Sequence, residues 1–526
     1  MTAHPPDSSQ HTVRLSWSGE QLLWCALALA LRLPKLEASE PWLDEACSLE
    51  LANQGPLTLL QTLITTDASP HPPLFFSLLS LSTTLLGEGL VAARLVSLLS
   101  GVLLVALSAY VANQLIGRRA ARLAALVTAL SPLAIHYSVE IRGYSLVSVL
   151  SLLYGLTLVR HLYQPDRVAI FPSLLCFGLA TLTHYYALAL LLLPVWIGLG
   201  SVDRRIWLRA TFALCFVAVP SASMAVAQLL KGAGGGAWIS AFHVSALIDS
   251  FAAFSLGTEM PHYLGQVAVI EVPDWVHYCG LSWTALGLVA ALFVKSREPG
   301  VRKMLYGVMV IVIAAPALGS LWRPMYLAGR YELAAMVPAQ VLAVCGWWQL
   351  VKRASLASWA RYALHFGVVL VLSSFMLPAY LQVQTQQPFE QIARQIGAHS
   401  TTKTLVIHTH LTAPPVDWQL RQSHFGGSTM VFPESQAQHR CWHKPMNTSR
   451  LAQARVEAQA LPSGLVYARV QRVFITQTLR RGRPTRSARI LIHALRNAGW
   501  MHRQSQAFGS YGLTAMDAPN AKMNTP

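Results

Sequence analysis

Eleven long apolar segments, almost free of charged side chains, recur between residues 20 and 381 of this chain of 526 residues. Segments of this kind are long enough to cross the hydrocarbon core of a bilayer. Because hydrocarbon offers the backbone no hydrogen-bond partner, each crossing is expected to be an α-helix. The composition agrees, since 12% of the residues are charged, against about 25% in soluble domains. The expected spans are 20–36, 90–116, 120–137, 143–160, 168–183, 185–200, 207–229, 276–294, 304–321, 332–350 and 362–381.

The basic loops predict how these spans are oriented. Lys and Arg collect in short loops on the cytoplasmic side of membrane proteins. With eleven spans and a cytoplasmic amino terminus, the basic clusters near 118–122, 160–167, 204–209, 295–303 and 352–361 all fall inside. The apolar stretch 72–86 is short for a crossing, and counting it as one would place these clusters outside. We therefore expect it to lie along the interface.

This orientation divides the chain into three expected domains. Residues 1–19 form a cytoplasmic tail, and residues 20–381 form the transmembrane domain with a first outer loop at 37–89. Residues 382–526 form a soluble extracytoplasmic domain. The fold class is therefore an all-α polytopic membrane protein of about eleven transmembrane helices with a small C-terminal α/β domain. We read the first span as a retained anchor, and the protein as a multi-pass protein of the plasma or inner membrane.

The C-terminal domain has a pattern of its own. Residues 388–398 and 486–498 have helical periodicity, whereas 404–408, which ends before Pro414-Pro415, and 463–475 resemble strands. This part carries 17 Lys or Arg and 5 Asp or Glu, a net charge of 17 − 5 = +12. Its basic face could meet anionic lipid headgroups, or it could be an ordinary solvated surface.

The seven cysteines show no paired spacing. Most of them lie in apolar segments, where a cysteine usually acts as a small hydrophobic residue. We therefore predict neither a disulfide framework nor a zinc site.

The first outer loop holds the clearest chemical signal, Trp42-Leu43-Asp44-Glu45. Two adjacent carboxylates close to lipid are costly and usually functional. Asp44 could accept a proton from an attacking hydroxyl, and Glu45 accompanies it as a candidate catalytic residue. His71 follows in an H-P-P-L sequence. The alternative is a helix start at which acidic residues are merely favourable.

Further polar residues gather at the other outer turns. Arginine binds phosphate through two parallel hydrogen bonds, and an anionic ligand would explain arginines on the outer side. Glu140 and Arg142 could instead form a structural pair, and the outer arginines could simply reach toward headgroups. The candidate residues for donor phosphate or sugar binding are His71, Glu140, Arg142, Tyr144, His184, Tyr185, Arg330 and Tyr331.

Cofactor motifs are sparse. A divalent cation could be held by carboxylates such as Asp44 and Glu140. The sequence contains neither a phosphate-binding P-loop nor a dinucleotide-binding glycine pattern. A soluble nucleotide donor is therefore unsupported, and we expect no nucleic-acid partner.

A series of short motifs carries a family resemblance. In order they are W-L-D-E-A (42–46), H-P-P-L-F (71–75), A-A-R-L (92–95), G-R-R-A-A (117–121), Y-S-V-E-I-R-G-Y (137–144), T-H-Y-Y (183–186) and G-R-Y (329–331). Their order and spacing over residues 20–350 resemble the GT-C glycosyltransferases of the protein O-mannosyltransferase superfamily, which includes the lipid A aminoarabinose transferases. Two features differ from those branches. The aminoarabinose branch has a lysine where His71 here meets Pro72 directly, and the protein-mannosyltransferase branch usually has a soluble domain inserted between late spans.

The resemblance implies an extracytoplasmic active site and a sugar donor linked to polyprenyl phosphate. It assigns the acidic pair to Asp44 and Glu45, with Asp44 as the base, and a second polar site to Glu140 and Arg142. The expected activity is inverting hexosyl transfer to an acceptor hydroxyl of a lipid, glycan or protein. A lipid or solute transporter is the alternative, although such proteins often contain internal repeats and none is detectable here. A membrane scaffold would not require the acid pair.

Overall fold

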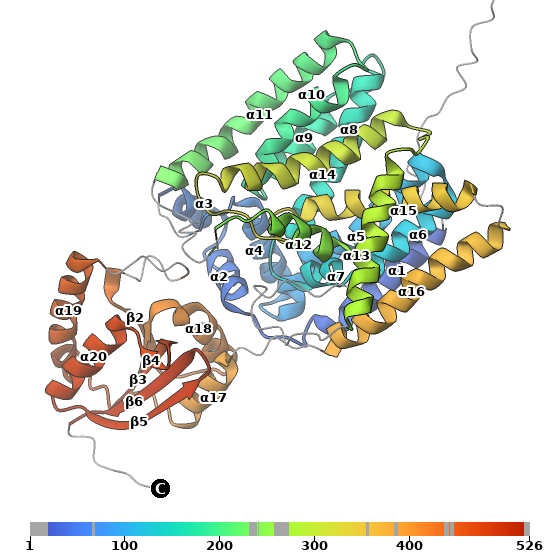
Figure 1. The fold of residues 1–526 in the computed structure, drawn as a ribbon. Coiled ribbons are helices and arrows are strands. Elements are labelled where there is room, and N and C mark those ends of the chain that lie inside the picture. The colour runs from blue at the N-terminus through green and yellow to red at the C-terminus, as the bar shows by residue number, and fades with distance from the viewer. Residues whose placement is uncertain are drawn as a thin grey trace, which may run out of the picture.

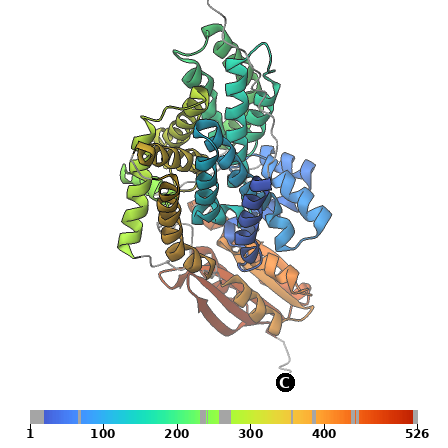
Figure 2. The same ribbon diagram turned by 90° about the vertical axis from the view of Figure 1, so that its right-hand side faces the viewer.

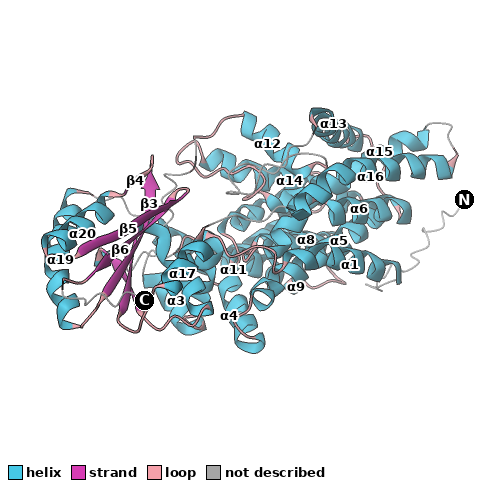
Figure 3. Ribbon diagram, turned by 90° about the horizontal axis from the view of Figure 1, so that it is seen from below, coloured by secondary structure: helices cyan, strands magenta, loops and turns pink. Residues whose placement is uncertain are grey.

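The computed structural model describes residues 19–65, 69–230, 239, 241–256, 273–353, 357–382, 388–435, 441 and 447–519. A helical part extends from α1 to α16, and a smaller α/β part follows it. Figures 1 and 2 show the α/β part at one end of the helical part. Every strand that the structure describes lies in that smaller part (Figure 3).

The helical part follows the apolar pattern of the sequence closely. The expected span at 90–116, for example, is one helix with those bounds. Its elements are α1 (Gly19–Arg32), η1 (Leu33–Lys35), α2 (Leu43–Ala52), α3 (Pro56–Thr65), α4 (Leu74–Leu86), α5 (Leu90–Ile116), α6 (Arg118–Leu130), α7 (Pro132–Val139), α8 (Tyr144–Tyr163), α9 (Phe171–Thr181), η2 (Tyr185–Leu192), α10 (Leu193–Gly198), α11 (Arg204–Leu230), α12 (Ser245–Phe254), α13 (Asp274–Ala291), α14 (Pro299–Gly319), η5 (Leu333–Ala335), α15 (Met336–Arg353) and α16 (Ser358–Gln382).

Within the described residues, five helical stretches are long and apolar enough to cross a membrane: α5, α8, α11, α14 and η5 with α15. A sixth consists of α6 and α7, which are bent by 59° relative to each other. The bend has a local cause, because Pro132 starts α7 and the hydroxyl of Ser131 accepts a hydrogen bond from the Ala134 amide at 3.4 Å. The protein is thus an integral membrane protein, and the count of eleven crossings stays a prediction.

Some expected spans consist of shorter pieces. Residues 185–200 form η2 and α10, and 168–183 contain the eleven-residue α9. The stretch 72–86, expected along the interface, is the short apolar helix α4.

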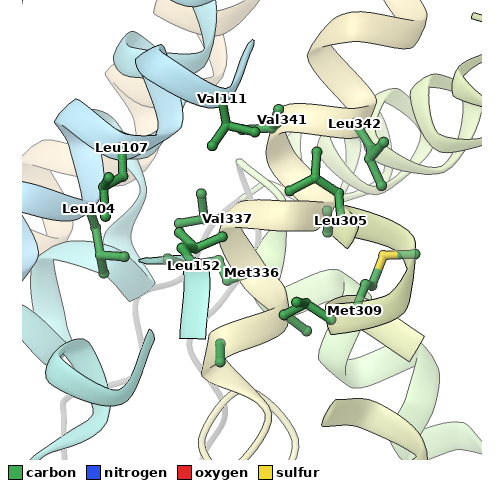
Figure 4. Packing of buried hydrophobic residues seen from close by; sticks show 14 of the residues in the cluster. Leu104, Leu107, Val111, Leu152, Leu305, Met309, Met336, Val337, Val341 and Leu342 are labelled. Carbon is green, nitrogen blue, oxygen red and sulfur yellow. The ribbon is translucent and has the colours of Figure 1, made fainter. Parts of the chain in front are cut away.

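The core of the helical part lies where α5, α8, α14 and α15 meet. Figure 4 shows Leu104, Leu152, Leu305 and Met336 from these four helices converging, and all four are buried. Nearby, α13 and α15 approach closely at two glycines. A Cβ atom on Gly346 would lie 1.9 Å from the carbonyl oxygen of Gly287. The two helices can therefore pack this closely only because residue 346 is a glycine.

The α/β part is a mixed sheet between two helical layers. The strand order is β2-β1-β3-β6-β5, with β4 paired to β3. Strands β1, β2 and β3 are parallel, whereas β6 is antiparallel to both β3 and β5. The elements are α17 (Phe389–Ala398), β1 (Thr404–Thr409), η6 (His410–Thr412), α18 (Ala413–Gln422), β2 (Ser428–Phe432), α19 (Thr448–Tyr467), β3 (Arg472–Arg480), β4 (Arg483–Pro484), α20 (Arg486–Asn497), β5 (Met501–Phe508) and β6 (Tyr511–Asp517).

Alternate residues of the strands bury themselves on opposite faces of this sheet. Val406 and Phe474 lie in a cluster with α17 and α18. Their neighbours Ile407 and Ile475 lie in a cluster with α19 and α20. This alternation is the period of two that an extended strand imposes on its side chains.

The strand predicted at 463–475 is wrong over its first half, because residues 463–467 end helix α19 and the strand β3 begins at Arg472. Ala454, Ala458 and Leu465 pack together on one face of α19, and their spacing is helical. The prolines 414 and 415 do not break the strand, because β1 ends at Thr409 and η6 follows it; the prolines lie in the first turn of α18.

We expect Gly346→Ala to lower the stability of the helical part by about 1–3 kcal/mol, because the new methyl group would force α13 and α15 apart. Thermal unfolding of the detergent-solubilised protein measures this. Gly367→Ala in α16 is the matched control, since a Cβ atom there meets nothing within 4 Å. Equal melting temperatures for the two variants would contradict the close helix contact.

Candidate active site

The acidic pair lies in the first turn of α2. The backbone of Trp42 is extended just before the helix, and its amide donates a hydrogen bond to Glu45 Oε2 at 3.4 Å. A carboxylate at this third position satisfies an amide that has no partner within the helix. Asp44 therefore projects from a helix start that the sequence itself specifies.

The carboxylate of Asp44 receives two guanidinium groups. Arg142 Nη2 lies 3.0 Å and Arg330 Nη2 lies 2.5 Å from the same oxygen, Oδ2. The arginine side chains are 7% and 2% exposed, whereas Asp44 retains 18%, so the acid is the most accessible of the three groups. Three groups from turns far apart in the chain thus converge on one point.

These neighbours control the ionisation of Asp44. Burial alone would raise the pKa of this carboxyl, but the charges and hydrogen bonds of Arg142 and Arg330 outweigh it and hold the pKa below its usual range. Asp44 is consequently a carboxylate at neutral pH.

The carboxylate of Glu45 bonds to a different arginine from the two that bond to Asp44. Its two oxygens accept bonds from Arg94 Nη2 at 3.2 and 3.3 Å, and the Ile141 amide donates to Oε1 at 2.8 Å. Arg94 and Glu45 are 2% and 3% exposed. The pair joins α2 to α5 and to the turn that follows α7, and with the Trp42 amide it occupies both oxygens of Glu45.

The turn between α7 and α8, at residues 140–143, carries Glu140 and Arg142. Glu140 Oε1 accepts a hydrogen bond from the Trp42 indole at 3.2 Å, and burial raises the pKa of Glu140 above its usual range. The backbone at Arg142 is held by Ser97, whose hydroxyl donates to the Arg142 carbonyl at 3.1 Å. Arg142 Nη1 also reaches the hydroxyl of Ser48, one turn after Asp44 in α2, at 3.3 Å.

Aromatic rings surround the guanidinium group of Arg330, the second arginine that bonds to Asp44. The Arg330 guanidinium carbon lies 5.3 Å from the ring centre of Trp42, 5.4 Å from that of Tyr144 and 6.0 Å from that of Tyr331. Arg330 Nε donates a hydrogen bond to the Tyr144 hydroxyl at 2.8 Å. Such rings stabilise a cation that has lost its water and fix the direction of the guanidinium.

A small pocket, open to solvent on one side, lies beside Arg142. It has a polar side and an apolar side, and its lining residues are His71, Pro72, Phe75, Phe76, Arg142, Gly143, Tyr144, Thr183 and His184. Gly143 is needed at its base, because a Cβ atom there would lie 2.9 Å from Thr183 Cγ2 and 3.2 Å from Phe75 Cβ.

Two histidines stand on the polar side of this pocket. The rings of His71 and His184 are 5.6 Å apart, and Arg142 Nη2 lies 3.4 Å from His71 Nε2. Burial and the nearby arginines hold the pKa of His71 well below its usual range, so its ring is neutral at pH 7. A buried atom, His184 Nε2, has no hydrogen-bond partner within the described structure and is available to a ligand.

Most of the residues predicted from the sequence are therefore brought together, with two differences. Glu45 bonds to Arg94 and to the Ile141 amide, and not to Arg142 or Arg330. Tyr185 has a buried hydroxyl without a partner in the described structure, whereas the next residue, Tyr186, contacts the ring of Tyr331 at 5.3 Å.

Trp42, Arg94 and Tyr186 are not among the site residues predicted from the sequence. Each lies inside one of the short motifs of the sequence, so motif membership was the signal that could have found them.

The residues at this site do not fit a divalent cation. The oxygen Oδ2 of Asp44 already bonds two cationic groups, and a metal ion there would lie against both positive charges. In the part of the chain that the structure describes, no cluster of three or more His, Cys, Asp or Glu side chains could hold a metal ion.

One expectation about cysteine is wrong. Cys47 of α2 and Cys441 of the α/β part form a disulfide, with Cα atoms 5.6 Å apart. The two residues are separated by 394 positions, so no spacing pattern could have indicated the pair.

Comparison with known proteins bears on this geometry. Residues 70–230 match the family model described as dolichyl-phosphate-mannose-protein mannosyltransferase. ArnT from Cupriavidus metallidurans superposes with a TM-score of 0.58 at 14% identity, covering 97% of this chain and 99% of that one. Its structure bound to undecaprenyl phosphate gives a TM-score of 0.57 at 13% identity, covering 95% and 98%. No curated protein matches in sequence.

The chain therefore has the GT-C glycosyltransferase fold of the ArnT structures, and residues 70–230 are similar to the protein mannosyltransferases of the family model. The oligosaccharyltransferase AglB from Archaeoglobus fulgidus, solved with an inhibitory peptide and a dolichol-phosphate, is a more distant match, with a TM-score of 0.50 at 12% identity and coverage of 96% of this chain and 74% of that one. The family model spans His71, Arg142 and His184, whereas Asp44 and Arg330 lie outside it and are joined to it only by the fold.

We expect Glu45→Gln to destabilise the protein by about 3–5 kcal/mol, because it leaves the buried guanidinium of Arg94 without its counter-charge. The melting temperature in detergent measures the loss. Glu20→Gln is the control, since Glu20 pairs with Arg122 at the surface, where both side chains are at least one-third exposed, and such pairs contribute about 0–1 kcal/mol. A variant at Glu45 as stable as the one at Glu20 would contradict the importance of the buried pair.

Proposed function

We propose that this protein is a glycosyltransferase that moves a sugar from a polyprenyl-phosphate donor to an acceptor hydroxyl at the extracytoplasmic face of the membrane, with inversion. The observation that carries the proposal is the convergence of Asp44, Arg142 and Arg330 on one point beside a half-apolar pocket. The fold supports it, because structures of the same fold have been solved with undecaprenyl phosphate and dolichol-phosphate.

The reaction is a single displacement. The acceptor oxygen forms a bond to the anomeric carbon while the bond from that carbon to the phosphate oxygen breaks. The leaving oxygen keeps the electron pair, and Asp44 takes the proton from the acceptor hydroxyl. Both guanidinium groups bond to Oδ2 of Asp44, which leaves Oδ1 for this proton.

The donor phosphate is bound by Arg142 and Arg330. A phosphate that bonds to these guanidinium groups weakens their hold on Asp44, so donor binding raises the pKa of the carboxyl and makes it a better base. The neutral histidines His71 and His184 donate ring N–H groups to phosphate or sugar oxygens. The apolar side of the pocket, at Phe75 and Phe76, takes the first isoprene units of the lipid.

The remaining polar residues position these groups. Glu45 and Arg94 hold the first turn of α2 against the turn at 140–143. Glu140 orients Trp42, and Trp42, Tyr144 and Tyr331 orient Arg330.

The disulfide supports the extracytoplasmic placement. Structural disulfides persist in oxidising compartments and are rare in the cytosol. Cys47 lies in the same helix as Asp44, so the environment of the disulfide is also that of the site.

Asp44→Asn should reduce transfer by about 100- to 10,000-fold, the range over which a positioned general base contributes. The assay incubates purified protein with a radiolabelled polyprenyl-phosphate sugar and membrane extract and follows label into the acceptor. Asp203→Asn, an exposed acid near the basic loop at 204–209, should keep full activity. Movement of label across a vesicle membrane without bond cleavage would favour a transporter, and full activity of Asp44→Asn would refute the base.

Arg142→Gln should weaken donor binding and shift the pH profile. The pKa of Asp44 is depressed in the wild type, so the carboxylate persists as the pH falls below the usual range for aspartate. Removal of one guanidinium raises that pKa, and the acid limb of kcat/KM moves to higher pH. Profiles of kcat/KM against pH for wild type, Arg142→Gln and the exposed control Arg118→Gln test this. An unshifted acid limb with unchanged donor KM would argue against the assigned role of Arg142.

A further inference from the structure

The α/β part rests on the helix that carries Asp44. Helix α18 contacts α2, and Trp418 packs against the apolar cluster that contains Leu49 and Leu51 of α2. Figure 1 shows α18 as the element of the α/β part that lies toward α2. The position of α18 follows from the sheet, because the chain leaves the carboxyl end of β1, turns through η6 and enters α18.

Polar contacts lie on both sides of the apolar contact between Trp418 and α2. Gln419 Nε2 donates a hydrogen bond to Glu40 Oε2 at 2.7 Å, just before α2. Arg421 Nη1 lies 3.8 Å from Glu50 Oε2, toward the other end of the helix. Both ends of α2 are therefore attached to α18.

The disulfide adds a covalent attachment close to the acid. Cys47 lies three positions after Asp44, so the two side chains are neighbours on the helix surface. The side chain of Cys47 is buried, and its sulfur is bonded to the sulfur of Cys441 in the α/β part. A helix of ten residues has little stability alone, so its direction depends on such contacts.

We propose that α18 and the Cys47–Cys441 disulfide form a clamp that positions α2, so that Asp44 meets Arg142 and Arg330 while the disulfide is intact. For its effect on turnover the clamp rests on the proposed function. Cys47, Cys441, Trp418 and Arg421 are positioning residues that act through α2. The α/β part is thereby a component of the site and not an appended domain.

Opening the clamp is an ordinary thiol–disulfide exchange. A dithiol reductant such as dithiothreitol attacks one sulfur, forms a mixed disulfide and leaves as its own cyclic disulfide. Cys47 and Cys441 each gain a proton and one of the two electrons. Oxidised glutathione reverses the exchange.

The first test does not need transferase activity. Peptide mapping of the full-length protein under non-reducing conditions should recover the peptides of Cys47 and Cys441 linked. Hydrogen exchange over residues 43–52 should then increase on reduction in the wild type but not in a Cys47→Ser variant, which is already open. Free thiols at both positions in oxidised protein, or exchange in α2 that reduction does not change, would overturn the clamp.

The second test measures turnover. Reduction of the wild type, or Cys47→Ser, should lower kcat about tenfold or more, because small displacements of a catalytic group have large effects on rate. The donor KM should change little, since both arginines belong to the helical part. Re-oxidation should restore the wild type alone. Cys279→Ser, at an exposed free cysteine, is the control and should behave as the wild type does.

The ionic contact offers a rescue test. Arg421→Glu should lower kcat, and the charge-exchanged double variant Arg421→Glu with Glu50→Arg should recover most of it. Wild-type kcat in the reduced protein and in Arg421→Glu would overturn the clamp while leaving the proposed transferase standing. Absence of transfer in the wild type would refute the function, and the exchange measurement would still decide the clamp.

Discussion

Two guanidinium groups bonded to one carboxylate oxygen are the interaction on which the rest of this structure depends. Removing an ion from water costs several kcal/mol unless partners replace the lost hydration. Asp44, Arg142 and Arg330 supply that replacement to one another, so the loops that carry them have to meet. The set is unbalanced, with two positive charges on one negative charge, and the excess favours a further anion. A phosphate on a lipid carrier meets this requirement and also suits the apolar wall of the pocket.

Hydropathy predicted the long helices of the helical part, and for 90–116 it predicted the bounds of α5, but it did not predict α2, α3 or α12. It could not predict which turns meet, because Asp44 and Arg330 are 286 positions apart and no local pattern records their contact. The series of motifs supplied that information indirectly, by resemblance. The roles of Glu45 and Tyr186 depend on the direction of a side chain from its helix or turn, which spacing alone leaves open. The Cys47–Cys441 pair and the continuation of α19 beyond 463 likewise depend on tertiary packing.

The α/β part shows how an ordinary soluble architecture can serve a membrane site. Its sheet buries alternate residues against helices on both faces, and the helix after β1 packs on one face through Val416 and Leu420 while other side chains of that helix make an external contact. That element, α18, reaches helix α2 through Trp418 and Arg421. The helical part supplies the arginines from its own turns and holds α2 through Glu45 and Arg94, while α18 of the α/β part contacts the same helix. The alignment of the acid with the arginines is consequently a property of the whole chain.

Gly143 has a consequence for how such a pocket can change. A Cβ atom at this residue would lie within 3.2 Å of both Thr183 and Phe75, so this part of the pocket wall has room for glycine but not for a larger residue. A larger residue would wedge α4 away from the turn before η2 and displace Arg142 with it. A change in the size of the ligand that this pocket accepts would therefore act through Phe76, His71 or His184, whose side chains can change while the turn stays in place.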